Sequence, residues 1–300
     1  MSGSSFAVVV TSSEKMMKTR GIWILETYAK RLTTFLVSNE VTLPRKTLMD
    51  SVTSGSCTER GFVRSCEWRS TSSRMGSFLI FVSQCGGLEK HGCCRVFRFL
   101  QEFPPWHDWV AFVDDDVYVS KCLPNHLPTV PTPLFAPAKH VGATGGWRWS
   151  LCGDAGRPET EIALPAGYGL ANRAFVKRLH HSAQMMIKQC AATPSYNFDV
   201  AFSFISWRLG INMTAVFDWT DSRVFWMGGQ RHLWRNDSYI FHKVRTKSDF
   251  QTLDALQVAI CGAGSDDVKR LFAERYSQNG YTKTRHAQTP SLRYKPFDCQ

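Results

Sequence analysis

The 300-residue chain has no long apolar run, because no window reaches the roughly 18 apolar residues that a bilayer-spanning helix needs. Residues 1–5 also lack the charged and apolar parts of a secretory signal peptide. No Cys-x-x-Cys pair suggests a zinc site, and the sequence contains neither an internal repeat nor a nucleic-acid-binding module. We therefore expect a soluble catalytic region, or a chain whose gene model lacks its membrane anchor.

The chain is basic, with a formal net charge of +11. Its 36 Lys and Arg residues are spread along the sequence rather than gathered in one block, which argues against specific nucleic-acid binding. A basic surface suits anionic small substrates, such as nucleotide diphosphates, or acidic membranes.

The ten cysteines are even in number, and glycosylation sequons begin at Asn212 and Asn236. Together these features favour a secretory, oxidising lumen. A local disulfide is expected between Cys85 and either Cys93 or Cys94. Buried free thiols in a cytosolic enzyme are the alternative.

Short apolar runs rich in β-branched and aromatic residues predict buried strands. These runs are residues 6–10, 35–37, 78–82, 109–113, 134–136 and 239–242. Apolar residues at helical spacing predict helices over residues 19–31, 96–103, 173–189, 199–209 and 265–276. The opening order of strand, helix and strand predicts an α/β fold, in which helices cover a parallel sheet.

Residues 44–76 are rich in Ser, Thr, Arg and Gly and have no hydrophobic period. Such a long stretch is unusual inside a compact domain, so we expect an insertion or a disordered loop. We predict one catalytic domain over residues 1–250, followed by a helical extension over residues 251–300.

Three consecutive carboxylates, Asp114, Asp115 and Asp116, follow the apolar run 109–113 directly. Carboxylates where a buried strand leaves the core are costly unless a cation lies beside them. Their oxygens suit a hard divalent metal such as Mg²⁺ or Mn²⁺. The carboxyl end of a strand is also where open α/β folds bind ligands. The alternative is a solvated acidic turn.

The order of motifs resembles that of the Fringe-like β-1,3-glycosyltransferases, which are inverting enzymes of the GT-A type. The resemblance covers about residues 6–245, with a gap over the expected insertion. The blocks that carry it are residues 19–28, 109–119, 166–171, 199–203 and 241–243. It implies a Rossmann-like, mostly parallel central sheet with helices on both faces.

The resemblance also implies an activity. The chain would transfer a hexose (Gal, GlcNAc or GalNAc) from a UDP-sugar to a glycan or glycoprotein hydroxyl, forming a β-1,3 linkage. Mn²⁺ or another divalent cation would be the cofactor, and no nucleic acid would be a partner. The location would be the Golgi lumen of the secretory pathway, as a type II membrane protein if an anchor is missing from this chain.

By the same resemblance, Asp116 coordinates the metal and His242 completes its shell. Asp115 coordinates through water or orients the sugar, and Asp114 meets the ribose or a backbone amide. Asp199 matches the family's catalytic base. A single histidine after a strand is otherwise an ordinary core or surface residue, and an aspartate before a helix is otherwise an N-cap.

Four further residues are predicted to bind the nucleotide sugar. Thr11 and Arg20 lie after the first strand, where this fold receives uracil and ribose, and Ala166 and Gly167 lie in the family's glycine turn. Arg20 could equally be a solvent-facing helix residue. Gly167 could equally serve a plain turn between a strand and a helix.

Departures from the family pattern leave two rival functions open. Leu164 and Pro165 stand where the family has two glycines, Phe198 replaces an aspartate and Ser203 replaces a glycine. A non-catalytic nucleotide- or glycan-binding relative is therefore the first alternative. A metal-dependent phosphoryl-transfer enzyme or nuclease is the second, although the sequence has no second acidic cluster suited to a two-metal site.

Overall fold

The structure is a computed structural model, which describes the core of the chain in several stretches. These are residues 5–39, 56–68, 76–83, 85, 92–127, 129–137, 140–141, 162–163, 167–192, 198–211, 239–242, 244–256 and 261. The helix predicted over residues 265–276 and both sequons lie outside these stretches. None of the described helices is both long enough and apolar enough to cross a membrane.

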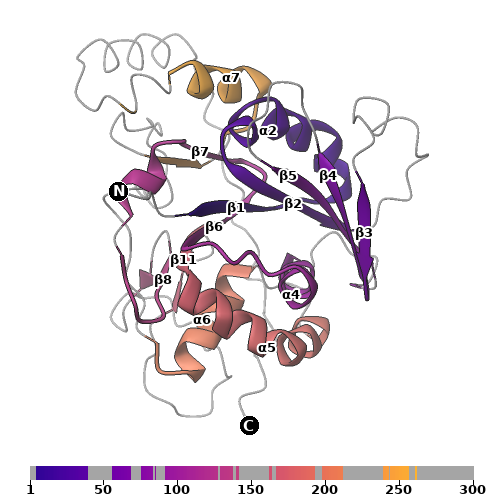
Figure 1. The fold of residues 1–300 in the computed structure, drawn as a ribbon, viewed down its shortest axis with the longest axis vertical. Helices are drawn as coiled ribbons and strands as arrows, with labels where there is room; N and C mark the ends of the chain where they lie inside the picture. The colour runs from indigo at the N-terminus through magenta and orange to yellow at the C-terminus, as the bar shows by residue number, and fades with distance from the viewer. Residues whose placement is uncertain are drawn as a thin grey trace, which may run out of the picture.

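An eight-stranded mixed sheet forms the centre of the fold (Figure 1), in the order β3-β4-β5-β2-β1-β6-β11-β8. Its four central strands run parallel, and they are β5 (Ser77–Val82), β2 (Thr33–Asn39), β1 (Phe6–Thr11) and β6 (Trp109–Asp114). Antiparallel strands extend both edges, and they are β3 (Cys57–Arg60), β4 (Val63–Trp68), β11 (Tyr168–Asn172) and β8 (Phe135–Pro137). The parallel centre confirms the predicted α/β fold class.

Helices cover both faces of this sheet (Figure 1). On one face lie α4 (Gly92–Glu102), α5 (Arg173–Ala192) and α6 (Phe198–Arg208). On the other lie α1 (Glu14–Met16), the π-helical turn η1 (Met17–Gly21), α2 (Ile22–Glu26), η2 (Tyr28–Lys30) and α7 (Lys247–Ala255). The remaining elements are η3 (Leu123–His126) and two small antiparallel sheets, β7 (Val117–Val119) with β12 (Ile240–His242) and β9 (His140–Val141) with β10 (Ile162–Ala163).

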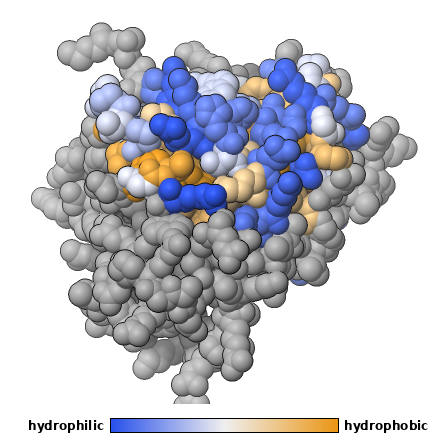
Figure 2. Space-filling model, turned by 90° about the horizontal axis from the view of Figure 1, so that it is seen from below, coloured by the Kyte–Doolittle hydropathy of each residue, from blue (hydrophilic) through white to orange (hydrophobic). Residues whose placement is uncertain are grey.

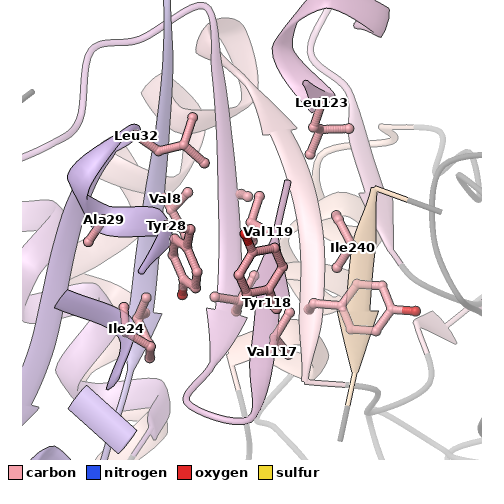
Figure 3. Close-up of a cluster of buried hydrophobic side chains, with 14 of the residues drawn as sticks. Val8, Ile24, Tyr28, Ala29, Leu32, Val117, Tyr118, Val119, Leu123 and Ile240 are labelled. Atoms are coloured by element: carbon pink, nitrogen blue, oxygen red, sulfur yellow. The ribbon is translucent and has the colours of Figure 1, made fainter. Parts of the chain in front are cut away.

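Side chains of β1 alternate between the two faces, so each face of the sheet has its own core. Val8 belongs to the same buried cluster as Tyr28, Tyr118 and Ile240, on the α2 side (Figure 3). Val9 instead belongs to the core under α4, α5 and α6. The α2-side core joins β7 and β12 to the main sheet, and these two strands carry part of the site described below.

The outer surface contrasts with both cores. The face seen in Figure 2 is mostly hydrophilic over the described residues, with smaller apolar areas between the polar ones. Helix α5 illustrates how this arises: Phe175 and Val176 are buried against the sheet, while Lys177 and Arg178 are exposed to solvent. This is the alternation expected of a helix that covers one face of a core.

Two local predictions were wrong, and some elements were missed. Residues 44–76 were expected to be an insertion or a disordered loop. The disordered-loop alternative is wrong for residues 56–68, which form the β3–β4 hairpin and extend the sheet beside β5, and the insertion stays a prediction. Every residue of β3 is exposed, so its sequence carries no apolar alternation that would reveal a strand. The single helix expected over residues 19–31 is broken into η1, α2 and η2. Strand β11 and helix α7 were not predicted at all.

Four disulfides crosslink the described residues: Cys57–Cys66, Cys85–Cys94, Cys93–Cys190 and Cys122–Cys261. The expected local pairing of Cys85 is confirmed, with Cys94 as the partner. No described cysteine is free. The longest crosslink, Cys122–Cys261, spans 139 residues and fastens the chain beyond α7 to η3. The division of the chain at residue 250 stays a prediction, although it falls within α7.

Phe202 of α6 tests the core under this face. Its ring contacts those of Phe97, Phe112 and Phe175, and it is fully buried. Phe202→Ala should lower the free energy of unfolding by about 3–5 kcal/mol, because it leaves a cavity among these rings. Lys177→Ala, on the exposed side of α5, should change it by less than about 0.5 kcal/mol. Urea unfolding measures both, and equal losses would contradict this packing.

Candidate functional site

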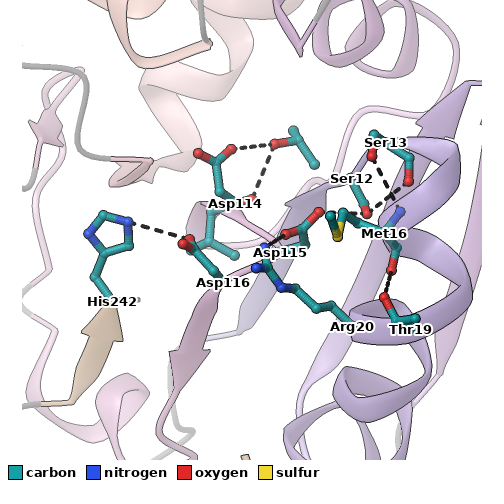
Figure 4. Close-up of polar contacts among 11 residues, drawn as sticks. Ser12, Ser13, Met16, Thr19, Arg20, Asp114, Asp115, Asp116 and His242 are labelled. Carbon is teal, nitrogen blue, oxygen red and sulfur yellow. Dashed lines mark hydrogen bonds and ion pairs between the residues drawn. The ribbon is translucent and has the colours of Figure 1, made fainter. Parts of the chain in front are cut away.

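The site forms where β1 and β6 end side by side. These strands are parallel and in register, with Thr11 beside Asp114. Ser12 and the carboxylates of Asp115 and Asp116 therefore leave the sheet at the same carboxyl edge. Each of the three aspartates has a different set of neighbours (Figure 4).

Asp114 points toward the face covered by α4, α5 and α6. The hydroxyl of Thr11 donates a hydrogen bond to its Oδ1 at 2.9 Å, and the Asp114 N–H donates to the Gly167 carbonyl at 2.6 Å. Burial raises the pKa of Asp114 well above its usual range, and the charges of Asp116 and Asp199 raise it further. The carboxyl of Asp114 is therefore the one least suited to carry a charge without a cation nearby.

Gly167 connects Asp114 with Asp199. Strand β11 pairs antiparallel with β6, and this pairing brings Gly167 to the end of β6. A Cβ on Gly167 would lie 2.5 Å from Asp114 Oδ2, and the residue has a φ of +75°. Only glycine satisfies both conditions without strain, because it lacks a Cβ and tolerates positive φ.

Asp199 lies in the first turn of α6 and has no exposed surface. Its Oδ2 accepts a hydrogen bond from the Gly167 N–H at 3.2 Å, and its Oδ1 accepts one from the Val200 N–H at 2.9 Å. The start of a helix favours a carboxylate, because the helix dipole is positive there. Since α6 begins at Phe198, Asp199 is a first-turn residue rather than the N-cap.

Asp115 turns the other way, toward η1. Its Oδ1 lies 2.7 Å from Arg20 Nη1 in a salt bridge, and its Oδ2 accepts a hydrogen bond from the Ser12 hydroxyl at 2.8 Å (Figure 4). Burial raises the pKa of Asp115, although both partners oppose this rise. The alternative that Arg20 is a free solvent-facing helix residue is wrong, since its guanidinium is committed to this carboxylate.

Asp116 faces His242. Strand β12 pairs antiparallel with β7, and the Val244 N–H donates to the Asp116 carbonyl at 2.8 Å. This pairing sets His242 Nε2 at 3.4 Å from Asp116 Oδ1 (Figure 4). Burial raises the pKa of Asp116, but the hydrogen bond and charge of His242, with the charges of Arg20 and Arg245, outweigh burial and lower it.

The Asp116–His242 pair fits a divalent cation. Ligand bonds of about 2.1 Å at a right angle place two donor atoms about 3 Å apart, close to the separation observed here. Carboxylate oxygen and imidazole nitrogen are both acceptable ligands of Mn²⁺. Among the described residues, no group of three or more His, Cys, Asp or Glu side chains is arranged to hold a metal. A cation here would depend on substrate oxygens or water for its other ligands.

Eight of the nine predicted site residues are therefore brought to one edge of the fold. They are Thr11, Arg20, Asp114, Asp115, Asp116, Gly167, Asp199 and His242. The ninth, Ala166, lies outside the described residues, as do Leu164 and Pro165. Sequence reasoning missed Ser12, whose only signal is its place directly after β1.

The chain matches no protein-family model and no curated protein. Among solved structures it is similar to the glycosyltransferase GlyE of Streptococcus pneumoniae TIGR4, with 13% identity and a TM-score of 0.42. That alignment covers 91% of this chain and 64% of GlyE. The galactosyltransferase LgtC, solved in complex with donor and acceptor sugar analogues, aligns with 10% identity and a TM-score of 0.45. This second alignment covers 89% of this chain and 99% of LgtC.

Gly167→Ala tests the close approach to Asp114, and Gly210→Ala is its matched control. Gly210 has a φ of +62°, but a Cβ at this position would have no atom within 4 Å. The control should lose only the backbone term, about 1–2 kcal/mol. Gly167→Ala should lose more, because its Cβ also displaces the Asp114 carboxylate. Urea unfolding compares the two variants. An equal loss in the free energy of unfolding would show that the Asp114 side chain can move away from the new Cβ without destabilising the fold.

The pKa of Asp114 predicts a pH-dependent stability. The pKa of Asp114 is higher in the folded than in the unfolded protein. The stability that its carboxyl contributes is therefore fully present below the unfolded pKa of about 3.9, and it is lost as pH rises through the folded pKa. In EDTA, Asp114→Asn should therefore gain stability relative to the wild type as pH rises from 4 to 8.

The stability of Asp108→Asn relative to the wild type should change in the opposite direction as pH rises. Hydrogen bonds from the Ser5 N–H and hydroxyl hold the pKa of Asp108 below its usual value. Its stabilising contribution is present above the unfolded pKa and is lost as pH falls, so this variant should lose stability relative to the wild type at neutral pH. Denaturant titrations at several pH values measure how the stability difference between each variant and the wild type depends on pH. A pH dependence of the same sign for both variants would contradict the opposite pKa shifts of Asp114 and Asp108.

Proposed function

We propose that the chain is an inverting, metal-dependent glycosyltransferase that moves a hexose from a UDP-sugar to a hydroxyl of a glycan or glycoprotein. The observation that carries the proposal is convergence: Asp116, His242, Arg20 and Asp199 come from four distant parts of the chain to one edge of the sheet. Glycosyl transfer needs these functions together, namely support for a leaving diphosphate and a base for the incoming hydroxyl.

The donor would lie along the carboxyl edge of β1 and β6. Thr11, Arg20 and Asp114 would contact the nucleoside part. Asp116 and His242 would hold the divalent cation, and Asp115 would bind it through water or orient the sugar. When bound, that cation would act as a Lewis acid that neutralises the diphosphate as it leaves. The basic surface of the chain would favour the approach of such an anionic donor.

Asp199 would act on the acceptor. The acceptor oxygen attacks the anomeric carbon, its proton passes to the Asp199 carboxylate, and the bond between that carbon and the diphosphate oxygen breaks. Attack from the side opposite the leaving group inverts the anomeric configuration. Gly167 would keep Asp199 in place through its N–H, and would leave room for the sugar because it has no side chain.

We place this reaction in the lumen of the secretory pathway, in the Golgi. The four disulfides support this location, because such bonds persist in oxidising compartments. The choice of Gal, GlcNAc or GalNAc, the β-1,3 linkage and anchoring as a type II membrane protein rest on the Fringe-like motif order alone.

A second candidate is a non-catalytic nucleotide- or glycan-binding relative. The observation that favours it is the burial of Asp199, which has no exposed surface and whose two oxygens already accept hydrogen bonds from the backbone. A base must come within hydrogen-bond reach of the proton it removes. This candidate predicts that UDP binds while no donor sugar is transferred.

The deciding experiment measures release of UDP and transfer of sugar with a panel of UDP-hexoses and Mn²⁺. Asp116→Ala should lower turnover by at least about 100-fold, the upper end of what loss of an outer-shell partner costs a metal site. Glu59→Gln, an exposed and remote change on β3, is the control and should leave turnover unchanged. Equal turnover by wild type and Asp116→Ala would overturn the proposal.

Asp199→Asn separates the two candidates. Under the transferase proposal, this variant keeps its affinity for UDP, measured by calorimetry, and loses turnover. If the wild type binds UDP but transfers none of the hexoses to any acceptor glycan, the non-catalytic candidate replaces the transferase.

A further inference from the structure

Arg95 of α4 is buried beside the site, and two of its three guanidinium nitrogens have no hydrogen-bond partner among the described residues. Only 5% of the residue is exposed, and the two nitrogens are Nε and Nη1. Buried guanidinium groups are nearly always paired, because an unmade hydrogen bond of a charged group is costly. A ligand that accepts hydrogen bonds from Arg95 when it binds would account for these unpaired nitrogens.

The position of Arg95 follows from its neighbours on α4. Phe99, one turn further along the helix, contacts Phe35 of β2 with ring centroids 5.3 Å apart. The first turn of α4 is tied by the Cys85–Cys94 disulfide to the chain that leaves β5. Helix α4 therefore runs from the carboxyl edge of the sheet toward the opposite edge, and Arg95 lies at the carboxyl edge.

The guanidinium itself extends toward that edge. Its Nη2 lies 3.9 Å from where a Cβ on Gly92 would be, so the side chain points back over the first turn of α4. Burial lowers the pKa of Arg95, against the charges of Asp114 and Asp115, which raise it. The charge of Arg95 therefore interacts with two aspartates of the site, Asp114 and Asp115.

An unmatched acceptor lies at the same edge and on the same face. The Oδ1 atom of Asn39, the last residue of β2, is buried and has no hydrogen-bond partner among the described residues. Phe35 and Val37 pack on the α4 side, so Asn39, two residues further, points to that side too. Thr11 of β1 and Asp114 of β6 share this face, and β2 lies about 10 Å from β6.

We propose that Arg95 and Asn39 recognise the edge of a uracil base and so select uridine nucleotides. Uracil presents an N3–H donor between two carbonyl acceptors. The Asn39 Oδ1 accepts a hydrogen bond from N3–H, and the Arg95 guanidinium donates to the adjacent carbonyl oxygen O4. The ribose and diphosphate then extend past Thr11 and Asp114 toward Asp116. This inference rests on the proposed function and adds two residues to the donor site.

The same pair disfavours cytosine. Cytosine has an unprotonated N3, which would face the Asn39 oxygen, and an amino group in place of O4, which would face the Arg95 guanidinium. At this buried site an acceptor would then face an acceptor, and a donor would face a donor. Sites built around hydrogen bonds reject a mismatched ligand strongly, because their polar groups are left unpaired.

Calorimetry with UDP and CDP in the presence of Mn²⁺ tests the proposal. Wild type should bind UDP at least about 10-fold more tightly than CDP. Arg95→Met should weaken UDP binding by about 10- to 100-fold, the range expected for losing a hydrogen bond to a charged group, and should bring the two affinities together. Arg98→Met is the control, because Arg98 lies on the same helix but stacks over Phe62 instead.

A second pair of variants covers the case in which Arg95→Met fails to fold. Asn39→Ala should lose the preference for UDP, and Asn39→Asp should keep it, because its carboxylate still accepts from N3–H. Unchanged UDP:CDP ratios in Arg95→Met, or in Asn39→Ala if the former does not fold, overturn this inference and leave the proposed function standing. Failure of the wild type to bind UDP at all overturns both.

Discussion

The site depends on how one strand end accommodates three consecutive carboxylates. Strand β6 is buried from Trp109 to Val113, so the carboxylates from Asp114 onward leave the core as a group. The backbone turns each side chain in a different direction, and each meets a different neighbour: Thr11 for Asp114, Arg20 for Asp115 and His242 for Asp116. Without these neighbours the mutual repulsion and burial of the carboxylates would oppose the fold.

The antiparallel strands β11 and β12, on either side of the aspartates, position the remaining residues of the site. Strand β11 brings Gly167 against Asp114 and, through its N–H, fixes Asp199. Strand β12 brings His242 to Asp116 by pairing with β7. A parallel core thus sets the position of the acidic cluster, and short antiparallel pairings add the groups that act with it. The two arginines lie on opposite faces, with Arg20 bonded to Asp115 and Arg95 buried on the α4 side.

Much of this could be predicted from the sequence, because the strongest signals are local. The apolar run before Asp114 identified β6, and the β-branched run at residues 6–10 identified β1. His242 and Gly167 were identified by motif order, since nothing in their own neighbourhood distinguishes them. Their approach to the aspartates follows from strand pairing across long sequence separations, which local patterns do not encode.

The failures also have physical causes. Strand β3 is wholly exposed and its apolar content is low, so residues 57–60 resemble a loop. Strand β11 contains Gly169, and glycine is a poor strand former that usually marks turns. Arg95 was overlooked because arginine is rarely buried, and only the packing of α4 against the sheet reveals its burial. Such features depend on tertiary contacts that the sequence does not display.

The central claim is that Asp116 and His242 together hold the cation that supports a nucleotide diphosphate. Pulsed electron paramagnetic resonance of Mn²⁺ bound with UDP tests it most directly, because a coordinated imidazole nitrogen modulates the signal of the ion. We predict nitrogen modulation in the wild type that disappears in His242→Gln. A Mn²⁺–UDP complex whose modulation is the same in both proteins, or that has none in the wild type, would contradict the account.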